Sequence, residues 1–439
     1  MPKGIRNITF SFEDQTLTHF GGMVIFQRFC RKLQLKRLFQ TYILWNRRNS
    51  RYHSVELLQS MIYTMVAGMG RIFDTRTIQY NGCFQELLGL KDFPKPSTLR
   101  EFLKGISLAE LQGIIRVHDL LRRHIWNLPH SSSSLIFDMD STVLPVFGWR
   151  IEGAKVGYNP AKPGRPSYQP LICFEGHTRD TWCGILRSGD THPASGAQEL
   201  WSNCRKKIPK YLYRIRIRAD SGFYDHKFIE PLDEEKIGYT VVAKMTKPVQ
   251  GKVQNLRYHT FRKGGWQAAR FNYQPRNWNK PHRFIVVRRP KPKSQEEEDN
   301  QLTLWEFKDY FYHAFVTNLP LSPENVWHFY KPRARCELDI RELKESFPLG
   351  DIPTNSFLAN QVHFHLILLA YDLVNWFKRL CLPQEWSSAA LHTLRRDLFA
   401  LPARLVHAGG KNQHKLPQRY LYQKLFYQTL SRIEHLKIT

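Results

Sequence analysis

Residues 329–345 read FYKPRARCELDIRELKE, and this stretch decides how the rest of the chain is interpreted. Its polar residues at steps of three, four and seven are Tyr330, Arg333, Glu337 and Lys344. Each residue of an α-helix advances by about 100°, so these side chains are expected to share one narrow face. A solvated helix face mixes charges without such an order. The stretch therefore predicts a helix that presents a carboxylate, two cations and a tyrosine to one partner surface.

One interruption is expected inside this helix. Pro332 lacks a backbone N–H, and its ring clashes with the preceding turn, so it should kink or restart the helix. The placement of Tyr330, which precedes the proline, therefore depends on how the helix breaks, whereas the placement of Glu337 does not.

The 439-residue chain is strongly basic, because Lys and Arg exceed Asp and Glu by 27. An excess of this size in a folded chain favours a polyanion partner, most often nucleic acid, over a ribosomal-type or membrane-surface role. With 42% hydrophobic residues, the chain can bury a substantial core. Its length allows roughly two to four domains or one elaborated domain.

Neither a membrane segment nor a disulfide framework is expected. The N-terminal residues MPKGIR lack the apolar region of a signal peptide, and the longest apolar run, residues 366–370, is far too short to cross a bilayer. The seven cysteines are scattered without a CxxC pair, which predicts a reducing cytoplasm and no zinc finger. No common zinc spacing is matched by Cys173, His177, Cys183 and His192.

The first 130 residues are predicted to be mainly helical. Residues 20–38 have helical apolar spacing with interleaved Arg and Lys. Two later helices are expected to begin at capping boxes, formed by Thr98 with Glu101 and by Ser107 with Glu110. Short helices with basic faces suit a domain that docks on DNA, while a purely structural or dimerising bundle would have the same pattern.

The period changes after residue 133. Residues 134–146 (SLIFDMDSTVLPV) alternate like a β-strand that places Asp138 and Asp140 on one face, opposite Phe137 and Met139. The series continues as strand, strand, helix, strand, helix, strand at residues 170–176, 181–187, 196–207, 213–222, 226–235 and 239–243. A β-rich insertion follows, then a buried strand at 312–319 and a helix with Ser322 as its cap.

Three carboxylates are expected to meet in this arrangement. Asp140 lies in the C-terminal half of the first strand and Asp220 at the end of the fourth, so the two meet if these strands are adjacent in a mixed sheet. Glu337 comes from the helix packed across that sheet. Three carboxylates can hold two Mg²⁺ ions, because Mg²⁺ prefers oxygen ligands and keeps several waters. Asp138 could instead be the metal ligand, or it could hydrogen-bond to a ligand from outside the metal site.

The chain resembles a known family in three stretches, FDMDSTVLPVFG, IRADSGFYD and YKPRARCELDIRELK. They are similar to DDE transposases of bacterial insertion sequences, in the branch with the Tyr-x2-Arg-x3-Glu-x6-Lys helix. The runs GGMVIFQRFCRKLQL and PSTLREF resemble one subgroup of that branch. The resemblance covers most of the chain, with the insertion and the tail matched loosely, and implies a ribonuclease-H-like catalytic core.

The resemblance also implies roles for individual residues. Asp140, Asp220 and Glu337 would be the catalytic metal ligands for two Mg²⁺ ions, for which Mn²⁺ could substitute. Two such ions about 4 Å apart can activate water or a 3′-hydroxyl and stabilise the leaving oxygen of a phosphodiester. The residues expected to contact DNA phosphates are Tyr330, Arg333 and Lys344, with Arg341 on the same helix and with Lys162 and Arg165 in the basic, mobile loop 148–170.

Related enzymes hold a flipped base against an aromatic side chain on the strand before the motif helix. Tyr312 and His313 are the nearest matches, and strand alternation lets only one of them face the site. The choice between them stays open, as do Trp278 and Trp305 as alternatives. Stacking could offset the few kcal/mol that base extrusion costs.

We therefore predict an α/β fold with a ribonuclease-H-like mixed sheet flanked by helices. The predicted domains are a mainly helical DNA-binding domain, the first part of the catalytic core, a β-rich insertion, the second part of the core, and a helical C-terminal region that could dimerise. Their bounds are residues 1–130, 131–244, 245–311, 312–350 and 351–439.

The predicted function is DNA transposition. The protein would act in the bacterial cytoplasm, associated with the nucleoid, as a homodimer on double-stranded DNA. It would bind the terminal inverted repeats of its element, cleave the ends and join them to target DNA. The alternatives are a domesticated DNA-binding protein without catalysis and a ribonuclease-H-like nuclease that only hydrolyses.

Overall fold

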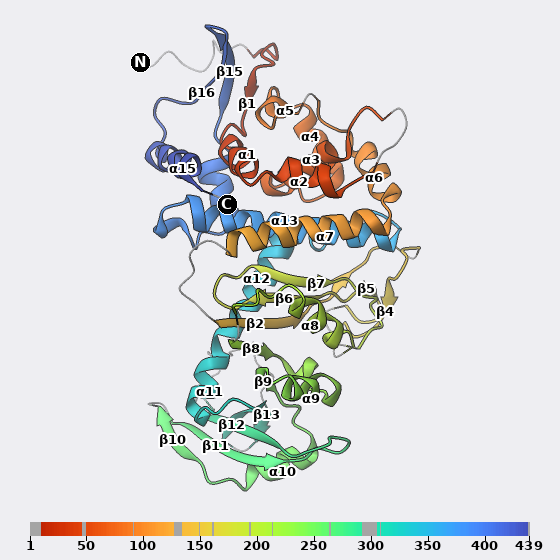
Figure 1. Cartoon of the computed structure of the whole chain (residues 1–439), viewed down its shortest axis with the longest axis vertical. Coiled ribbons are helices and arrows are strands. Elements are labelled where there is room, and N and C mark those ends of the chain that lie inside the picture. The colour runs from red at the N-terminus through yellow and green to blue at the C-terminus, as the bar shows by residue number, and fades with distance from the viewer. Residues whose placement is uncertain are drawn as a thin grey trace. The chain divides into compact units, whose positions relative to one another are not determined.

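The computed structural model describes residues 10–45, 50–90, 92–126, 134–148, 150–159, 162–192, 195–212, 214–262, 265–291, 305–307 and 309–437. By its internal contacts the chain forms two compact units (Figure 1). The helical unit combines Met1–Leu121, Ser346–Thr354 and Leu373–Thr439. The sheet unit combines Arg122–Glu345 and Asn355–Asp372. Segments from both ends of the chain thus share one unit, and the division into five domains remains a prediction.

The helical unit contains short helices and a small sheet. Its helices are α1 (Met23–Lys32), α2 (Leu35–Tyr42), α3 (Ser54–Ala67), α4 (Thr75–Gln79), α5 (Phe84–Leu87), α6 (Pro96–Gly105), α7 (Leu108–Trp126, whose last residues belong to the sheet unit), α14 (Leu391–Leu394) and α15 (Gln423–His435). Single 3-10 or π turns lie at Ile72–Asp74, Gln384–Trp386 and Arg395–Phe399. Its strands pair in the order β1 (Leu17–Thr18), β15 (Ala403–Ala408) and β16 (Lys411–Lys415).

Capping residues and proline determine where α7 and α6 begin, and one predicted helix start is corrected. Before α7, the Ser107 hydroxyl accepts from the Ala109 N–H at 3.2 Å, and Glu110 accepts from the Ser107 N–H at 2.9 Å, which confirms the predicted capping box. The start predicted at Thr98 is wrong, because α6 already begins at Pro96. Proline fixes the backbone angle that a first helical turn needs.

The prediction of a wholly helical C-terminal region is wrong. β15 and β16 form an antiparallel hairpin, joined by Gly409 and Gly410, which both have positive φ (59° and 70°). Two glycines in a row supply the left-handed backbone of a tight hairpin turn. Arg404 is exposed and Leu405 is buried, so the strand alternates as half-buried strands do.

One helix passes a simple test for a membrane span. α13 (Phe357–Cys381) is long and apolar enough by length and composition, although 78% of its most apolar window is buried. The core helix of a soluble protein passes the same test, so α13 is weak evidence for a membrane. The five-residue apolar run in the sequence understates this helix, because polar residues such as Asn375 interrupt its apolar face.

The sheet unit is built on one mixed sheet, which has ten strands in the described residues. These are β2 (Ser134–Ser141), β6 (Leu171–Glu175), β7 (Thr181–Ile185), β8 (Arg214–Ala219), β9 (Gly238–Val242), β10 (His259–Arg262), β11 (Trp266–Tyr273), β12 (His282–Pro290), β13 (Trp305–Phe307) and β14 (Tyr310–Thr317). Their order is β10-β11-β12-β14-β9-β8-β2-β6-β7, with β13 beside β14. β8 is parallel to both β2 and β9, and the other pairs are antiparallel.

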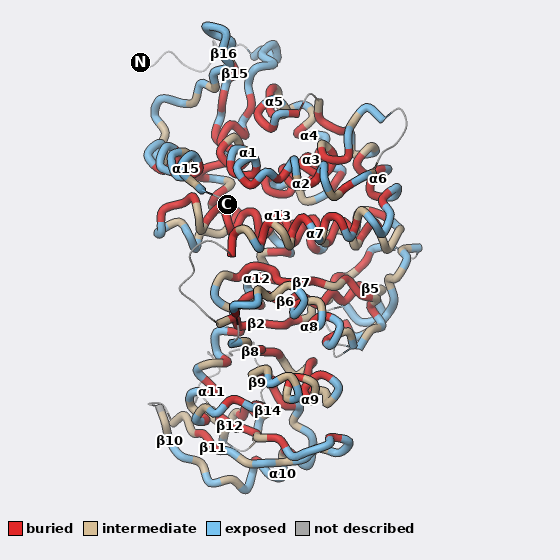
Figure 2. The backbone as a smooth tube through the Cα atoms, viewed as in Figure 1, coloured by how far each residue is buried: buried red, intermediate tan, exposed pale blue. Residues whose placement is uncertain are grey.

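The two faces of β2 meet different partners. Phe137 and Met139 join one buried apolar core with side chains of α8 (Ala197–Arg205) and α9 (His226–Glu234), as the alternation predicts. Asp138 and Asp140 point to the other face, where Asp138 contacts Arg179 and Asp140 contacts Arg333 of the motif segment, residues 329–345. Figure 2 shows β2 and β6 buried along most of their length. Polar side chains on this second face must therefore be paired within the protein.

The β-rich insertion continues the sheet. β14 pairs with β12 on one side and, through Phe315, Val316 and Thr317, with β9 on the other. The insertion also contains α10 (Lys247–Gln254). The predicted boundary at residue 311 thus falls inside β14, a strand shared by the insertion and the rest of the sheet.

The break predicted at Pro332 is confirmed. α11 (Pro323–Tyr330) begins after Ser322, whose hydroxyl accepts from the Asn325 N–H at 3.3 Å. A 3-10 turn, Lys331–Ala334, contains Pro332, and α12 (Arg335–Glu345) follows. The motif segment is therefore two α-helices joined by a tight turn, not one continuous helix.

Burial of His313 makes a prediction about stability and pH. The ring lies 5.1 Å from the Trp327 ring, is 3% exposed, and burial, with Arg289 adding to it, lowers its pKa to about 3. An unfolded histidine titrates near 6.5, so the native state gains stability above that pH and loses it as the pH falls. Between pH 7 and pH 5 the loss from His313 should be about 2 kcal/mol.

Denaturant unfolding at both pH values tests this. His313→Leu should remove about 2 kcal/mol of the pH dependence. Phe315→Leu, a buried change in the same strand, should lower stability at both pH values and keep the dependence. Equal pH dependence in the wild type and in His313→Leu would show that this histidine is not held neutral by the fold.

Candidate active site

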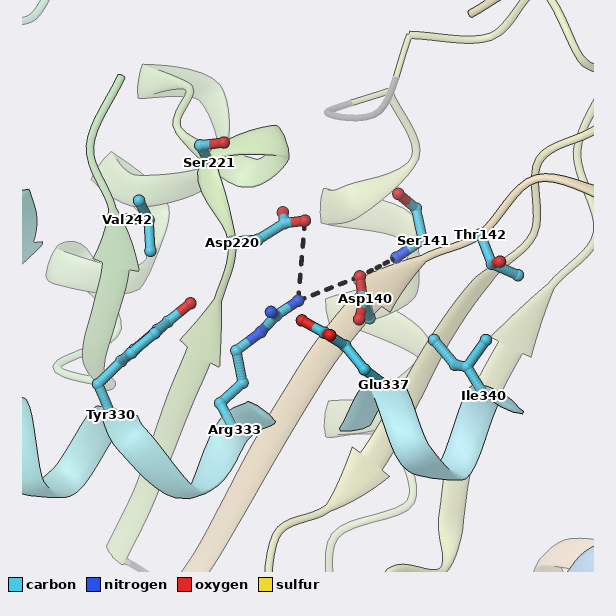
Figure 3. A pocket seen from close by; sticks show the side chains of 10 residues that line it. All are labelled: Asp140, Ser141, Thr142, Asp220, Ser221, Val242, Tyr330, Arg333, Glu337 and Ile340. Atoms are coloured by element: carbon cyan, nitrogen blue, oxygen red, sulfur yellow. Dashed lines mark hydrogen bonds and ion pairs between the residues drawn. The ribbon is translucent and has the colours of Figure 1, made fainter. Parts of the chain in front are cut away.

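A cavity of about 270 Å³ opens on the polar face of the sheet. Asp140 comes from β2, Asp220 from the turn after β8, and Glu337 from α12. Figure 3 shows the three carboxylates reaching the same space from three elements. The cavity is lined by Asp140, Ser141, Thr142, Asp220, Ser221, Val242, Tyr330, Arg333, Glu337 and Ile340.

The register of two parallel strands brings the aspartates together. Met139 of β2 is opposite Ala219 of β8, so the next residue along each strand is an aspartate. The chain then turns at Asp220, whose carboxylate accepts from the Gly222 N–H at 2.9 Å. The Asp140 carboxylate accepts from the Ser141 N–H at 2.8 Å. The two strands are adjacent, which is the condition under which the sequence predicts that their carboxylates meet.

The turn at Pro332 aligns the motif residues. In a 3-10 helix, side chains three residues apart eclipse each other, so Tyr330 and Arg333 point the same way. Glu337 lies one α-helical turn further along and points to the same cavity. The three motif residues thus share a face although the segment is not one helix. Lys344 does not line the cavity.

Arg333 lies between the two aspartates. Its Nη2 is 3.1 Å from an oxygen of Asp140 and 3.7 Å from an oxygen of Asp220 (Figure 3). The same nitrogen donates to the Met139 carbonyl at 3.3 Å. The side chain is 4% exposed, and its Nε has no hydrogen-bond partner in the part of the chain that the structure describes. Buried guanidinium groups are stable only when paired, so Arg333 serves as the countercharge of this carboxylate cluster.

The site disfavours a full set of charged carboxylates. Burial is the main cause that raises the pKa of Asp140 to about 6, a net value to which Asp220 and Glu337 add and which Arg333 opposes. Burial and repulsion by neighbouring acids both favour the protonated form of a carboxyl group. The cluster therefore favours additional positive charge at the cavity.

A buried ion network behind the cavity fixes the motif segment. Asp138 is fully buried and accepts from Arg179 at 2.9 Å and from Arg218 at 2.6 and 2.8 Å. Arg218 also donates to the Phe329 carbonyl at 2.8 Å. Arg179 donates through Nε to Asp339 of α12 at 2.7 Å. Through these two arginines, Asp138 holds α11 and α12 against the sheet. Asp138 does not line the cavity.

The family model described as Transposase DDE domain group 1 matches residues 2–438. The chain belongs to this family. A search of curated proteins found no match. A solved structure of the piggyBac transposase synaptic complex with hairpin DNA is similar, with a TM-score of 0.44 and 12% identity over 87% of this chain and 79% of that chain. The family assignment rests on the match to the family model.

In this DDE transposase the donor chemistry of the cavity fits a Mg²⁺-type cation. Three side chains offer carboxylate oxygens, which such ions prefer. Among the described residues, no group of three or more His, Cys, Asp or Glu side chains already has the arrangement of a metal site. The carboxylates do not form such an arrangement because the Arg333 guanidinium occupies the space between Asp140 and Asp220.

In the transposase, Tyr330, Arg333 and Lys344, three of the residues predicted to contact phosphates, make hydrogen bonds within the protein. Tyr330 is 1% exposed, and its hydroxyl donates to the Ala219 carbonyl at 3.4 Å. Lys344 donates to the Val143 carbonyl at 3.2 Å, which ties α12 to the segment after β2. Arg341 is exposed on α12. Of the motif-segment residues predicted to contact phosphates, only Arg341 and Lys344 have the exposure that a surface contact needs.

The aromatic residues expected to stack on a base are mostly buried. Tyr312 and His313 are each 3% exposed, and the Tyr312 hydroxyl accepts from Arg288 at 3.3 Å. Trp278 is 7% exposed and packs 5.2 Å from the Tyr224 ring. Trp305 is half-buried and stacks on Phe307 at 5.3 Å. Neither Tyr312 nor His313 is among the residues that line the cavity, and a base-stacking role for either of them stays a prediction.

The described residues of the basic loop 148–170 include two short strands, which the sequence does not predict. Within it, β4 (Lys155–Val156) and β5 (Pro166–Tyr168) form a small sheet with β3 (Leu144–Pro145), in the order β3-β5-β4. Lys162 and Arg165 are exposed on this loop. These strands could not be found from the sequence, because each has only two or three residues, too few to show a period.

Most contacts of the buried ion network could not be predicted from the sequence. The sequence allows Asp138 to be a partner outside the metal site. No motif or spacing near Arg179 or Asp339 predicts that these two residues pair. Arg179 has a left-handed backbone (φ 64°) in a tight turn, which non-glycine residues rarely adopt. Its partners lie 41 and 160 residues away, so only the fold brings them together.

The ion network predicts a contrast between two neighbouring aspartates. Asp138→Asn should lower the free energy of unfolding by about 3–5 kcal/mol, because it leaves two buried arginines without full compensation. Asp140→Asn should leave the protein at least as stable as the wild type, since it removes a buried charge that Asp220 and Glu337 repel.

Chemical denaturation of both variants, with wild-type protein as the reference, measures this contrast. Far-UV circular dichroism would check that each variant folds before it is compared. A stability loss from Asp138→Asn no larger than that from Asp140→Asn would contradict a structural role for the network.

Proposed function

We propose that this chain is a DNA transposase that binds the terminal inverted repeats of its insertion sequence, cleaves the element ends and joins them to target DNA. The observation that carries the proposal is the convergence of Asp140, Asp220 and Glu337 on one cavity in a chain of the DDE family. Each reaction step would be an in-line attack on a phosphodiester by water or by a 3′-hydroxyl.

Asp140, Asp220 and Glu337 would hold two Mg²⁺ ions, with Mn²⁺ as a substitute. When bound, such a pair activates the attacking oxygen and stabilises the leaving oxygen. The fit is supported by the oxygen donors and by the raised pKa of Asp140, which burial and its acidic neighbours cause. An added cation would relieve the repulsion among these three groups.

Arg333 would have two partners in succession. Without DNA it neutralises Asp140 and Asp220, as its ion pairs indicate. A DNA phosphate would compete for the same guanidinium, because arginine binds phosphate and carboxylate with the same fork of donors. Release of Arg333 to DNA would leave the aspartates available to the cations, so DNA binding and metal binding would favour each other.

The remaining parts of the proposal concern the fold and the partners. The sheet with parallel, adjacent β2 and β8 would be the ribonuclease-H-like core, and the helices of residues 1–130 would contact the element ends. The excess of 27 positive charges favours double-stranded DNA, both element ends and target, as the partner. A homodimer would hold the two ends together, in the bacterial cytoplasm and near the nucleoid.

Replacing Glu337 by Gln should abolish end cleavage in Mg²⁺ while the affinity for end DNA stays within about twofold. The amide keeps the shape of the side chain but loses the charge that a cation needs. The substrate would be a labelled duplex taken from the DNA that flanks the coding sequence. Glu345→Gln, an exposed change on the same helix, is the matched control and should cleave normally.

Cleavage by Glu337→Gln at the wild-type rate would refute its role as a metal ligand. Loss of DNA binding in this variant would indicate a structural role instead. Products joined to a second DNA would separate a transposase from a nuclease that only hydrolyses. Failure of the wild type to cleave in Mg²⁺ or Mn²⁺ while binding DNA would favour the domesticated DNA-binding protein.

Metal binding should also be visible without catalysis. A ligand that binds only the native state at about 100 times its Kd stabilises that state by about 2.7 kcal/mol. Mg²⁺ or Mn²⁺ should therefore raise the Tm of the wild type by roughly 3 °C. Asp220→Asn should lose this shift and Glu345→Gln should keep it. An equal shift in Asp220→Asn would place the bound metal elsewhere.

A further inference from the structure

Phe147 is a large apolar side chain that the fold leaves in solvent. It lies two residues beyond the end of β3 and is 70% exposed. Val146, the residue before it, is buried, and its N–H donates to the Pro166 carbonyl at 2.9 Å. The backbone next to Phe147 is therefore fixed, and its ring is held outward by the structure.

Two cations lie over this ring. The Lys162 Nζ is 5.0 Å and the Arg165 guanidinium carbon 4.6 Å from the ring centroid, distances at which a cation is attracted to an aromatic face. The Arg165 N–H donates to the Lys162 carbonyl at 3.3 Å, and the Lys162 N–H donates to the Asn159 side chain at 3.1 Å. We call Phe147, Lys162 and Arg165 the aromatic–basic cluster.

The cluster is attached to the candidate active site. Thr142 lines the catalytic cavity, and the carbonyl of the next residue, Val143, accepts a hydrogen bond from the ammonium of Lys344 in α12. Phe147 is four residues beyond Val143, so its Cα lies within about 14 Å of the Val143 Cα. A DNA strand whose phosphodiester enters the cavity would bring its neighbouring nucleotides within reach of the cluster.

We propose that the aromatic–basic cluster binds an unpaired nucleotide of the DNA strand next to the cleaved phosphodiester. The base would stack on Phe147, and Lys162 and Arg165 would contact the phosphates on either side. This inference rests on the proposed transposase function and adds to it the residue that receives a base. Stacking on an exposed ring beside cations is how proteins hold single-stranded nucleic acid.

The chemistry favours a nucleotide over a protein partner. A purely apolar contact would not place two cations on the ring, whereas a nucleotide offers both a π face and a phosphate. The two aromatic residues expected from the sequence for this task, Tyr312 and His313, are each only 3% exposed. Phe147 is exposed where they are not, on the segment that leads directly from β2.

Photocrosslinking tests the proposal on the full-length protein. The probe is a duplex from the DNA that flanks the coding sequence, with a short single-stranded end and with 5-iodouracil at successive positions near that end. Irradiation should link Phe147 to one or two adjacent positions, identified by mass spectrometry. Phe147→Leu should lose the crosslink and weaken binding about tenfold, as the loss of one base–aromatic stack predicts, and Phe147→Trp should retain both.

Two controls separate stacking from other effects. Tyr158→Leu, a matched change at a residue in the same loop that is also 70% exposed, should bind and crosslink like the wild type. The double variant Lys162→Gln/Arg165→Gln should weaken binding and reduce its salt dependence by about two phosphate contacts. Thermal unfolding of each variant would confirm that these surface changes leave the fold intact.

The outcomes distinguish the inference from the proposed function. If the wild type binds and cleaves the flanking DNA but Phe147→Leu binds equally well and no crosslink maps to residue 147, the inference is wrong. If the wild type neither binds nor cleaves this DNA, the proposed function itself fails. If Phe147→Leu changes only self-association measured by light scattering, the cluster is a contact between protein copies and the inference is also wrong.

Discussion

The carboxylate of Asp138 is the charge on which the arrangement of the site depends. It is fully buried and accepts hydrogen bonds from Arg179 and Arg218. Each arginine also binds a different part of the motif segment, Arg218 the end of α11 and Arg179 the side chain of Asp339 in α12. Because a buried charge is costly unless it is paired, these four groups hold one another in place. Glu337 is positioned through this set of contacts.

The charged groups that face the cavity, Asp140, Asp220 and Arg333, are not balanced in the way that the Asp138 network is. Asp138 is saturated by its arginines, whereas Asp140 shares a single guanidinium with Asp220. One network is complete and stabilises the fold; the other lacks positive charge and is suited to bind it. Two aspartates separated by one residue on the same strand therefore have opposite functions, and burial alone does not distinguish them.

Much of this arrangement follows from sequence. The alternation in residues 134–146 correctly placed both aspartates on one face, and Pro332 correctly marked the break before α12. Contacts between distant residues could not be foreseen, because nothing local relates Arg179 to Asp339. The exposure of Tyr330 was misjudged for the same reason: helical spacing indicates which residues share a face, but only packing decides whether that face meets solvent. The basic residues of the β15–β16 hairpin do not distinguish a strand from a helix, and Gly409 and Gly410 are the local signal of its turn.

The pairing of β14 with β9 has a consequence for the integrity of the protein. Without β14, the main-chain N–H and C=O groups along one side of β9 would have no partner, and an open strand of this kind recruits other chains. The sequence of β9, GYTVV, has no charge to discourage such pairing. The C-terminal half of β14 therefore covers the parallel part of the sheet. A shortened chain that lacked β14 would tend to aggregate through the open edge of β9.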